Sequence, residues 1–465
     1  MRYVSTRGEA PAVSFLDAVI AGLAPDGGLY VPERWPQLSA AEIAGLAGRS
    51  YAEVAADIVG RFAGGAVDPS ALAEICAQAY ASFDHPAVAP LKQLAPGRFL
   101  LELFHGPTLA FKDIALQLLG GLYDHVLKAQ GRRLTIVCAT SGDTGGAAVE
   151  AFRGRTNVRL VALFPKGRIS EVQRRFMTTT GEANIACLEV EGAFDDCQAM
   201  LKDMFRDAQF ARSVDLSGVN SINFARIAAQ AVYYFTAAVA LGAPHRRIAF
   251  AAPTGNFGDA YAGYVAQRLG LPIERIVVAV NSNDILCRAL ESGRYARGEA
   301  VATSSPAMDI QVASNFERLY FEAADRDGPG TARAFATFAA TGALDIPPRA
   351  LAGMRGLFEA AAVSEAETAH TILATLKATG ELVDPHTAVG LAAAARIGPA
   401  DPATPLVTLS TAHPAKFPEA VTAAAGVAPR APASVARLAQ RRERFEPIDA
   451  DVAAAKAYVR EFAAA

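Results

Sequence analysis

The stretch LTIVCATSGDTGG, residues 134–146, decides the fold class, because an apolar run leads there into a glycine-rich loop. The run Leu134–Ala139 has the length and composition of a buried strand, and a helical pattern starts near Ala147. A strand that passes through a glycine turn into a helix is typical of the βαβ units that build parallel sheets. The sequence therefore predicts an α/β fold.

Four more apolar runs follow the same pattern, separated by helical stretches of ten residues or more. These further predicted strands are Val158–Phe164, Arg247–Ala252, Arg275–Val280 and Leu406–Leu409. Between about residues 320 and 400 the chain is rich in alanine and predicted to be helical.

The flanks of this α/β region differ from it. Residues 1–95 are predicted to be mostly helical, with a turn at Ala24–Gly28, and the proline-bearing stretch Pro86–Gly97 to be an inter-domain connection. The charged tail after Pro429 is predicted to be helical and at the surface. We therefore expect three parts, residues 1–95, 96–425 and 426–465.

Composition excludes several classes of protein. The chain has 465 residues, 52% of them hydrophobic, and a formal net charge of -3, so nothing favours nucleic acid or an anionic membrane as a partner. The five cysteines form no CxxC pair, so neither a zinc site nor a disulfide framework is indicated, and reduced thiols in a cytoplasmic protein are expected. The apolar run Ile227–Ala243 is too short to span a bilayer and predicts a buried core helix.

Two glycine-rich loops follow predicted strands, where open parallel sheets bind ligands. Ser141-Gly-Asp-Thr144 offers hydroxyls and amides at a helix start, and Gly255-Asn-Phe-Gly-Asp259 offers bare amides that suit a phosphate. A capped turn without a ligand explains either loop alone equally well. Neither loop matches G-x-G-x-x-G, which disfavours a nicotinamide dinucleotide.

Three further segments carry polar groups of interest. Asn220 and Ser221 open the long apolar helix as N-cap candidates, and Arg226 stands just over one turn in, where a bound anion would offset the helix dipole. Lys112 stands beside apolar residues near a helix start, a setting that lowers a lysine pKa as Schiff-base chemistry requires. Ser410 and Thr411 follow the last predicted strand, where a hydroxyl could meet the ring nitrogen of a ligand. His413 is interpreted as a structural turn residue.

Taken in order, these segments resemble the threonine synthase family of fold-type II pyridoxal-phosphate enzymes. The resemblance spans nearly the whole chain. The segments that carry the resemblance are residues 3–8, residues 22–32, His105-Gly-Pro-Thr-Leu-Ala-Phe-Lys-Asp113, Ser141–Gly145, Asn220–Arg226, Gly255–Asp259 and Thr411–Phe417. It implies parallel or mixed sheets flanked by helices, an extra mostly helical N-terminal domain, and pyridoxal 5'-phosphate as cofactor.

The resemblance also implies residue roles. Lys112 would attach the cofactor and act as the proton-transfer base. The other implied cofactor-binding residues are Gly255, Asn256, Phe257, Gly258, Asp259 and Thr411. The implied substrate-binding residues are Ser141, Gly142, Asp143 and Thr144 for the carboxylate, and Asn220, Ser221 and Arg226 for the phosphate. Many fold-type II relatives carry asparagine at the position of Asp143, so the partner of the cofactor's 3'-hydroxyl stays open.

The implied reaction converts O-phospho-L-homoserine and water into L-threonine and phosphate, by a β,γ-elimination and replacement. The nearest alternatives are a phospholyase of threonine-synthase type and a serine or threonine dehydratase. A dehydratase releases an uncharged hydroxyl and has no need of Arg226 or of the N-terminal part. A binding protein that keeps the cofactor without catalysis is a further alternative. A small-molecule substrate, no metal and a homodimer are expected.

Overall fold

Two largely parallel sheets form the framework of the computed structural model, which describes residues 1–219 and 221–464. The smaller sheet has the order β16-β8-β7-β6-β9, and all its pairings are parallel. Its strands are β6 (Leu134–Ala139), β7 (Val158–Pro165), β8 (Ile185–Glu191), β9 (Leu216–Gly218) and β16 (Glu446–Asp449). The predicted α/β fold is confirmed.

The larger sheet has the order β14-β11-β10-β15-β5-β4. Its strands are β4 (Leu91–Ala95), β5 (Arg98–Glu102), β10 (Ile248–Pro253), β11 (Ile273–Val280), β14 (Phe358–Ala362) and β15 (Leu406–Ser410). Only the β4–β5 pairing is antiparallel among the described strands of this sheet. The prediction of Pro86–Gly97 as a connection is therefore wrong, because β4 lies inside it and pairs with β5 as the edge of the sheet.

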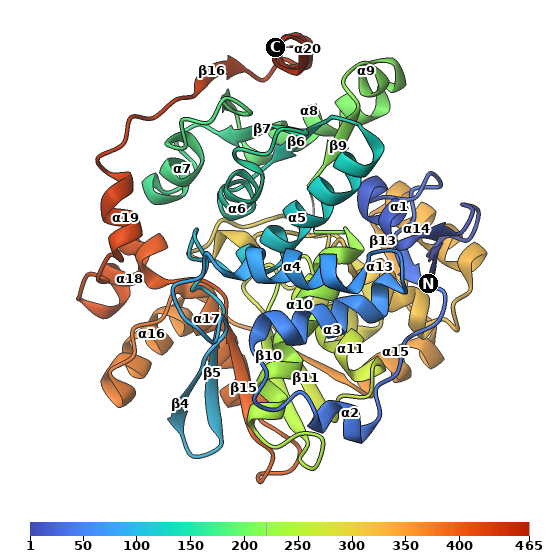
Figure 1. Ribbon diagram of the computed structural model, residues 1–465. Coiled ribbons are helices and arrows are strands. Elements are labelled where there is room, and N and C mark those ends of the chain that lie inside the picture. The colour runs from blue at the N-terminus through green and yellow to red at the C-terminus, as the bar shows by residue number, and fades with distance from the viewer. Residues whose placement is uncertain (220, 465) are drawn as a thin grey trace.

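Helices cover both sheets, and Figure 1 shows the smaller sheet and its helices above the larger one. The helices of the smaller unit are α6 (Asp143–Phe152), α7 (Glu171–Thr178), α8 (Phe194–Arg206) and α9 (Ala208–Ser213). Those around the larger sheet are α5 (Lys112–Gln130), α10 (Phe224–Ala240), α11 (Gly258–Arg268), α12 (Ile285–Ser292), α13 (Phe316–Ala323), α14 (Gly328–Thr341), α15 (Pro348–Arg355), α16 (Glu365–Thr379), α17 (Pro385–Ile397) and α18 (Pro418–Ala425). Short elements complete this region: η1 (Pro306–Met308), η2 (Pro414–Lys416), β12 (Arg294–Ala296) and β13 (Ala343–Asp345).

The helix α10 is the centre of the largest hydrophobic cluster, and nearly all of its residues are buried. This confirms the prediction of a buried core helix there, although the helix begins at Phe224, with Asn223 as its cap. No helix among the described residues combines the length and the apolar character that a membrane span requires. The five cysteines are free and buried, as predicted.

The N-terminal segment packs its helices against this core. It contains β1 (Arg2–Ser5), β2 (Val13–Ser14), α1 (Phe15–Ala21), β3 (Tyr30–Pro32), α2 (Ala40–Ala44), α3 (Tyr51–Ala63) and α4 (Pro69–Tyr80). These four helices confirm the helical prediction, and the segment also contains a small antiparallel sheet, β2-β1-β3, which was not predicted. The turn at Ala24–Gly28 is held by Asp26, which accepts hydrogen bonds from Ser5 Oγ (2.7 Å) and Gly28 N (2.9 Å).

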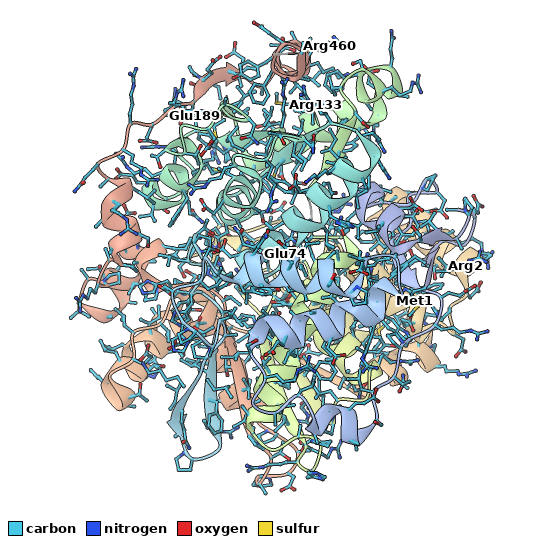
Figure 2. The ribbon with its side chains drawn as sticks, in the orientation of Figure 1. Met1, Arg2, Glu74, Arg133, Glu189 and Arg460 are labelled. Atoms are coloured by element: carbon cyan, nitrogen blue, oxygen red, sulfur yellow. The ribbon has the colours of Figure 1, made fainter. Side chains whose placement is uncertain are left out.

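The C-terminal tail lies mostly at the surface, as predicted, and runs from the larger unit to the smaller one. It runs through α19 (Ala433–Leu438) and β16 to α20 (Val452–Ala464), which lies over the smaller sheet (Figure 1). In Figure 2 Arg460 of α20 lies at the top of the molecule, far from Met1 at its right side. The prediction of a purely helical tail is wrong at β16, which pairs with β8 in parallel. Its short, exposed sequence contains Pro447, which an edge strand tolerates.

Candidate active site

Four neighbouring loops lead from the carboxyl ends of strands to one region between the two sheets. The loop after β6 precedes α6, the loop after β10 precedes α11, β15 is followed by Thr411, and β5 is followed by the segment that reaches Lys112. Carboxyl ends of parallel strands are where open α/β sheets bind ligands. The order of strands therefore brings together segments that are up to 300 residues apart.

Lys112 is the first residue of α5, and its position is fixed by a short pairing with the segment after β15. Phe111 N donates to Thr411 O (2.9 Å), His413 N donates to Leu109 O (3.1 Å), and Ala110 forms an isolated bridge with Ala412. Leu109 has a φ of 61°, a left-handed conformation that turns the chain into the helix. The pairing places Phe111, the residue before Lys112, against Thr411.

The ammonium of Lys112 lies in a mostly buried setting with charged neighbours. Its Nζ is 3.7 Å from Oδ2 of Asp143, and the Lys112 side chain is 11% exposed. Burial lowers the pKa of Lys112; Asp143 and Asp259 counteract this effect, while Lys416 and Arg226 add to it. A lysine that loses its proton readily can act as a nucleophile and as a base.

Asp143 is the first residue of α6, and it faces two lysines. Lys416 Nζ lies 2.6 Å from Asp143 Oδ1, and Gln173 Nε2 donates to the same oxygen (3.0 Å). Burial raises the pKa of Asp143, but the charges of Lys416 and Lys112 outweigh it and hold that pKa far below its usual range. Asp143 is therefore a carboxylate that already has cationic partners.

The loop before α6 is tightly closed by Thr140, whose Oγ1 accepts hydrogen bonds from Gly142 N (2.9 Å) and Gly145 N (2.8 Å). Gly142 has a φ of 122°, and a Cβ at Gly145 would lie 2.4 Å from the Thr140 side chain. Only glycine fits at these two positions. The helix begins at Asp143, earlier than the predicted Ala147, so the partly exposed Thr144 lies in its first turn.

The loop before α11 has the geometry of an anion cradle. Thr254 donates its hydroxyl proton to Asp259 and accepts a hydrogen bond from Phe257 N (3.1 Å), while Phe257 has a φ of 63°. The N-cap residue Phe257 offers no side-chain hydrogen bond to the start of α11, and Asp259 Oδ1 accepts from Ala260 N (2.9 Å). The start of the helix carries the positive end of the helix dipole, which favours an anion there. Burial raises the pKa of Asp259 to about 6.

Asn256 and Ser221 are joined by Asn315, a residue that the sequence analysis missed. Asn315 donates from Nδ2 to Ser221 O (3.0 Å) and to Asn256 O (3.2 Å). Arg318 is fully buried and donates to Asn315 Oδ1. A Cβ at Gly258 would be 3.3 Å from Asn315 Nδ2, so the glycine permits this close approach. The loop before α11 and the start of α10 are thus fixed relative to each other.

Arg226 lies in the first turn of α10, whose cap residue is Asn223. The sequence predicts it just over one turn into the helix. Its side chain is 3% exposed, and within residues 1–219 and 221–464 its Nε and Nη1 have no hydrogen-bond partner. Burial lowers the pKa of Arg226 to about 10. A buried guanidinium with unpaired N–H groups is costly unless an anion binds there. The predicted residue Asn220 lies outside the described residues.

At the end of β15 the two hydroxyl candidates differ in their surroundings. Ser410 Oγ lies 3.1 Å from Thr387 Oγ1, in a buried network with Asp384. Thr411 is buried at 4% exposure in the segment that pairs with Phe111. His413 caps η2 by accepting from Ala415 N (3.1 Å), in keeping with a structural turn histidine.

The site fits pyridoxal 5'-phosphate in its donor groups. It offers backbone amides at the start of α11 for a phosphate, and a buried lysine of lowered pKa for an aldehyde carbon. It also offers Arg226 for a further anion, because Nε and Nη1 of this residue have no hydrogen-bond partner among the described residues. Lys416 and Gln173 also belong to the site, because both contact the Asp143 carboxylate. The sequence analysis assigned a role to neither residue. Lys416 belongs to the quoted segment Thr411–Phe417, whereas Gln173 follows no recognisable motif.

Comparisons with known proteins agree along the whole chain. Residues 2–80 match the family described as "Threonine synthase N terminus", residues 88–411 match "Pyridoxal-phosphate dependent enzyme", and residues 387–459 match "Threonine synthase, C-terminal". A threonine synthase of Pseudomonas aeruginosa is 50% identical over 421 residues, which cover 90% of this chain and 90% of that protein.

Two solved structures are similar over their full length. The crystal structure of PLP-bound threonine synthase from Brucella melitensis has a TM-score of 0.97 and 51% identity, covering 100% of both chains. The crystal structure of threonine synthase from yeast has a TM-score of 0.94 and 37% identity, covering 100% of this chain and 99% of that one.

Proposed function

The chain belongs to the threonine synthase family of pyridoxal-phosphate-dependent enzymes. We propose that, in the reaction of that family, Lys112 attaches the cofactor and transfers protons, while two anion sites bind the phosphate groups of cofactor and substrate. The chain is a carbon–oxygen lyase of threonine biosynthesis. The reaction converts O-phospho-L-homoserine and water into L-threonine and phosphate. The phospholyase and dehydratase alternatives are not favoured by the comparisons.

The observation that carries the assignment of the substrate is the buried guanidinium of Arg226, whose Nε and Nη1 have no hydrogen-bond partner in the part of the chain that the structure describes. It holds the phosphate of O-phospho-L-homoserine, together with Ser221 and Asn220. The guanidinium geometry matches phosphate oxygens. A net charge of -3 gives no general attraction for an anion, so the affinity has to come from such local groups.

Lys112 attaches the cofactor and moves protons at the substrate's Cα and Cβ. Pyridoxal 5'-phosphate, when bound, supplies an electron-withdrawing ring that stabilises negative charge next to Cα. The burial of Lys112 supports this role because it favours the neutral amine, which is the form that accepts a proton.

The cofactor is held at both ends. The loop Gly255–Asp259 binds its phosphate through backbone amides, and Thr411 faces its pyridine nitrogen with a neutral hydroxyl. A neutral partner leaves that nitrogen largely unprotonated and moderates its electron withdrawal. The helix start at α11, where the N-cap residue makes no side-chain hydrogen bond, and the burial of Thr411 support these assignments.

The substrate carboxylate is bound by the loop before α6. Ser141 and Thr144 supply hydroxyl and amide donors at the start of this helix, and Gly142, whose own amide donates to Thr140 Oγ1, shapes the loop around the carboxylate. Asp143 contributes its backbone only, because its side-chain carboxylate faces Lys416 and Lys112 and would repel a second carboxylate.

A product assay tests the function. Purified protein is mixed with O-phospho-L-homoserine, and threonine, phosphate and 2-oxobutyrate are quantified together. We expect threonine and phosphate in equal amounts. Phosphate with 2-oxobutyrate and no threonine would mean a lyase without water addition, and no turnover in protein that holds the cofactor would favour a binding protein.

Arg226→Gln tests the phosphate site in the same assay. We expect KM for O-phospho-L-homoserine to rise by roughly 10- to 100-fold, the loss of hydrogen bonds to a charged group. Competitive inhibition by inorganic phosphate should weaken in parallel. The control is Arg155→Gln, an arginine that bonds Ala151 O at the far end of α6. An unchanged KM in Arg226→Gln would remove this residue from the substrate site.

We also propose that the protein acts in the cytoplasm as a homodimer. Five buried free thiols support a reducing compartment. The dimer rests on the resemblance to fold-type II enzymes, which are often dimers. Light scattering after size exclusion tests it: a mass twice that of one chain is expected, and the mass of a single chain would exclude it.

A further inference from the structure

A buried carboxylate between two lysines is the feature of this site that the proposed roles leave without a purpose. Asp143 Oδ1 lies 2.6 Å from Lys416 Nζ, and its Oδ2 lies 3.7 Å from Lys112 Nζ. The side chains of Lys416 and Asp143 are 1% and 5% exposed. Water therefore screens neither interaction effectively.

We propose that Lys416 is a positioning residue for Lys112: by neutralising Asp143 in a close ion pair, it keeps Asp143 from holding Lys112 as an ammonium. This inference rests on the proposed role of Lys112 as the cofactor lysine and names the group that regulates it. Lys416 itself forms no bond with cofactor or substrate in this role.

The geometry explains why Lys416, and not Lys112, is the stronger partner of Asp143. The contact with Lys416 is the shorter by more than 1 Å, and Gln173 Nε2 donates to the same carboxylate oxygen (3.0 Å). The ammonium of Lys416 also lies 5.6 Å from the centre of the Phe176 ring, which favours a cation there. Lys112 is left with a carboxylate whose charge is already balanced.

The charge balance around Lys112 follows from its neighbours. Besides Asp143 and Lys416, the charged groups that act on it are Arg226 from α10 and Asp259 from α11. Without Lys416, the full negative charge of Asp143 would act on Lys112 and favour its protonated form. A protonated lysine is neither a nucleophile for an aldehyde nor a base.

The pair also joins the two sheets. Asp143 begins α6 on the smaller sheet, whereas Lys416 ends η2, which follows β15 of the larger sheet. Gln173 comes from α7, where its side chain also accepts from Ser170 N (3.1 Å) in a capping box. The protonation of Lys112 is therefore linked to how the smaller unit sits on the larger one.

The test measures the pKa of Lys112 in the apoprotein, from the pH dependence of its reductive methylation by formaldehyde, read by mass spectrometry of the peptide. In Lys416→Met we expect this pKa to rise by about one unit or more, since a carboxylate within about 4–6 Å is left unbalanced. Lys416→Arg keeps the positive charge and should return the pKa toward the wild-type value.

The double variant Asp143→Asn/Lys416→Met guards against misfolding, because it removes both charges of the pair and leaves neither partner as an unpaired ion in the core. We expect its Lys112 pKa to return to within about half a unit of wild type, well below the raised value of Lys416→Met. The matched control is Lys456→Met, which breaks the remote Lys456–Asp207 pair (2.8 Å) and should leave Lys112 unchanged.

Two results would overturn the inference: a Lys112 pKa in folded Lys416→Met equal to wild type, or a double variant whose pKa stays as high as that of Lys416→Met. Failure of the proposed function is a separate result. Borohydride reduction of the wild-type holoprotein followed by peptide mapping should place the cofactor on Lys112. A label on another residue would remove Lys112 from its role, whatever its pKa in the apoprotein.

Discussion

At the scale of single residues, Lys112 differs from the other lysines in being buried next to a carboxylate that already has a closer partner. We predict that Lys112→Ala loses threonine and phosphate formation together, by at least about 10³-fold, because attachment and proton transfer both depend on this amine. The matched control is Lys128→Ala, an exposed lysine in the last turn of the same helix. Equal activity of both variants in the product assay would contradict the role of Lys112.

Asp113, the residue after Lys112, makes the stability of the fold depend on pH. Burial raises the pKa of Asp113 to about 6, although Thr108 donates to both of its oxygens (2.8 and 2.6 Å). The unfolded chain loses this proton near pH 4, so the stabilising contribution of the neutral form is lost as the pH rises from about 4 to about 6.

We therefore predict that Asp113→Asn, whose side chain stays neutral, gains stability relative to wild type as the pH rises through this window. Thermal unfolding of the two apoproteins between pH 4 and pH 7 measures the difference in midpoint. That difference should become more favourable to the variant from pH 4 to pH 6 and then level off. A difference independent of pH would show that Asp113 does not titrate in this range.

Most of the residues that form the site could be predicted from the sequence, because they lie in loops marked by glycine, hydroxyl and lysine after apolar strands. Gln173 and Asn315 could not. Each acts by a side-chain hydrogen bond to a segment that is 30 or more residues away, and no local pattern encodes such a contact. Lys416 lay within a recognised segment, but its partner Asp143 is known only from the fold.

At the scale of elements, the start of α11 depends on the absence of a side chain at Gly255. A Cβ there would lie 2.9 Å from Ala307 O and 3.0 Å from Met308 Cα, both of them backbone atoms that cannot rotate away. We predict that Gly255→Ala displaces the loop and weakens cofactor binding by roughly 10-fold or more, as a misplaced set of phosphate donors implies.

The control for this loop is Gly353→Ala in α15, where a Cβ would meet nothing within 4 Å. Alanine is the better helix former, so this variant should gain about 1 kcal/mol of stability and keep its cofactor affinity. Titration of the apoproteins with pyridoxal 5'-phosphate, followed by absorbance, measures both affinities. If Gly255→Ala bound the cofactor as tightly as wild type, the loop would accommodate a Cβ at this position, contrary to the distances above.

The strands that the sequence predicts share one property. All five, β6, β7, β10, β11 and β15, are interior strands of their sheets, and their apolar runs are buried on both faces. The edge strands β4, β9, β14 and β16 were not predicted, and neither were β5 and β8, which each adjoin an edge. Edge strands are short or half-exposed, and the alanines of β14 favour a helix until the sheet is present.

At the scale of the whole molecule, the division into residues 1–95, 96–425 and 426–465 remains a proposal, and two strands pair across its boundaries. The strand β4 ends at the first boundary but belongs to the larger sheet, and the tail contributes β16 to the smaller one. Both boundaries were inferred from changes in composition. Composition reports how exposed a segment is, whereas membership of a sheet depends on pairing with distant strands.

The tail is also tied to the helix that supports Asp143. Glu443 accepts hydrogen bonds from Arg174 Nε (2.8 Å) and Nη2 (3.0 Å) and from Thr178 Oγ1 (2.8 Å), all in α7. The same helix carries Gln173, which donates to Asp143. The tail thus holds α7 in the position that the active-site carboxylate requires.

We predict that Glu443→Gln loosens α7 and raises its amide hydrogen exchange by several fold at pH 7, since a bidentate charged contact is lost. The hydrogen bond from Arg174 is the largest cause that lowers the pKa of Glu443, so its stabilisation is present at neutral pH and is lost as the pH falls below about 4.3. The excess exchange in the variant should therefore persist down to about pH 4.3 and shrink as the pH falls further, after correction for the intrinsic rate. Glu419→Gln, an exposed glutamate of α18, is the control. Exchange in α7 that matches wild type at pH 7 would mean that the tail lies on this helix without holding it.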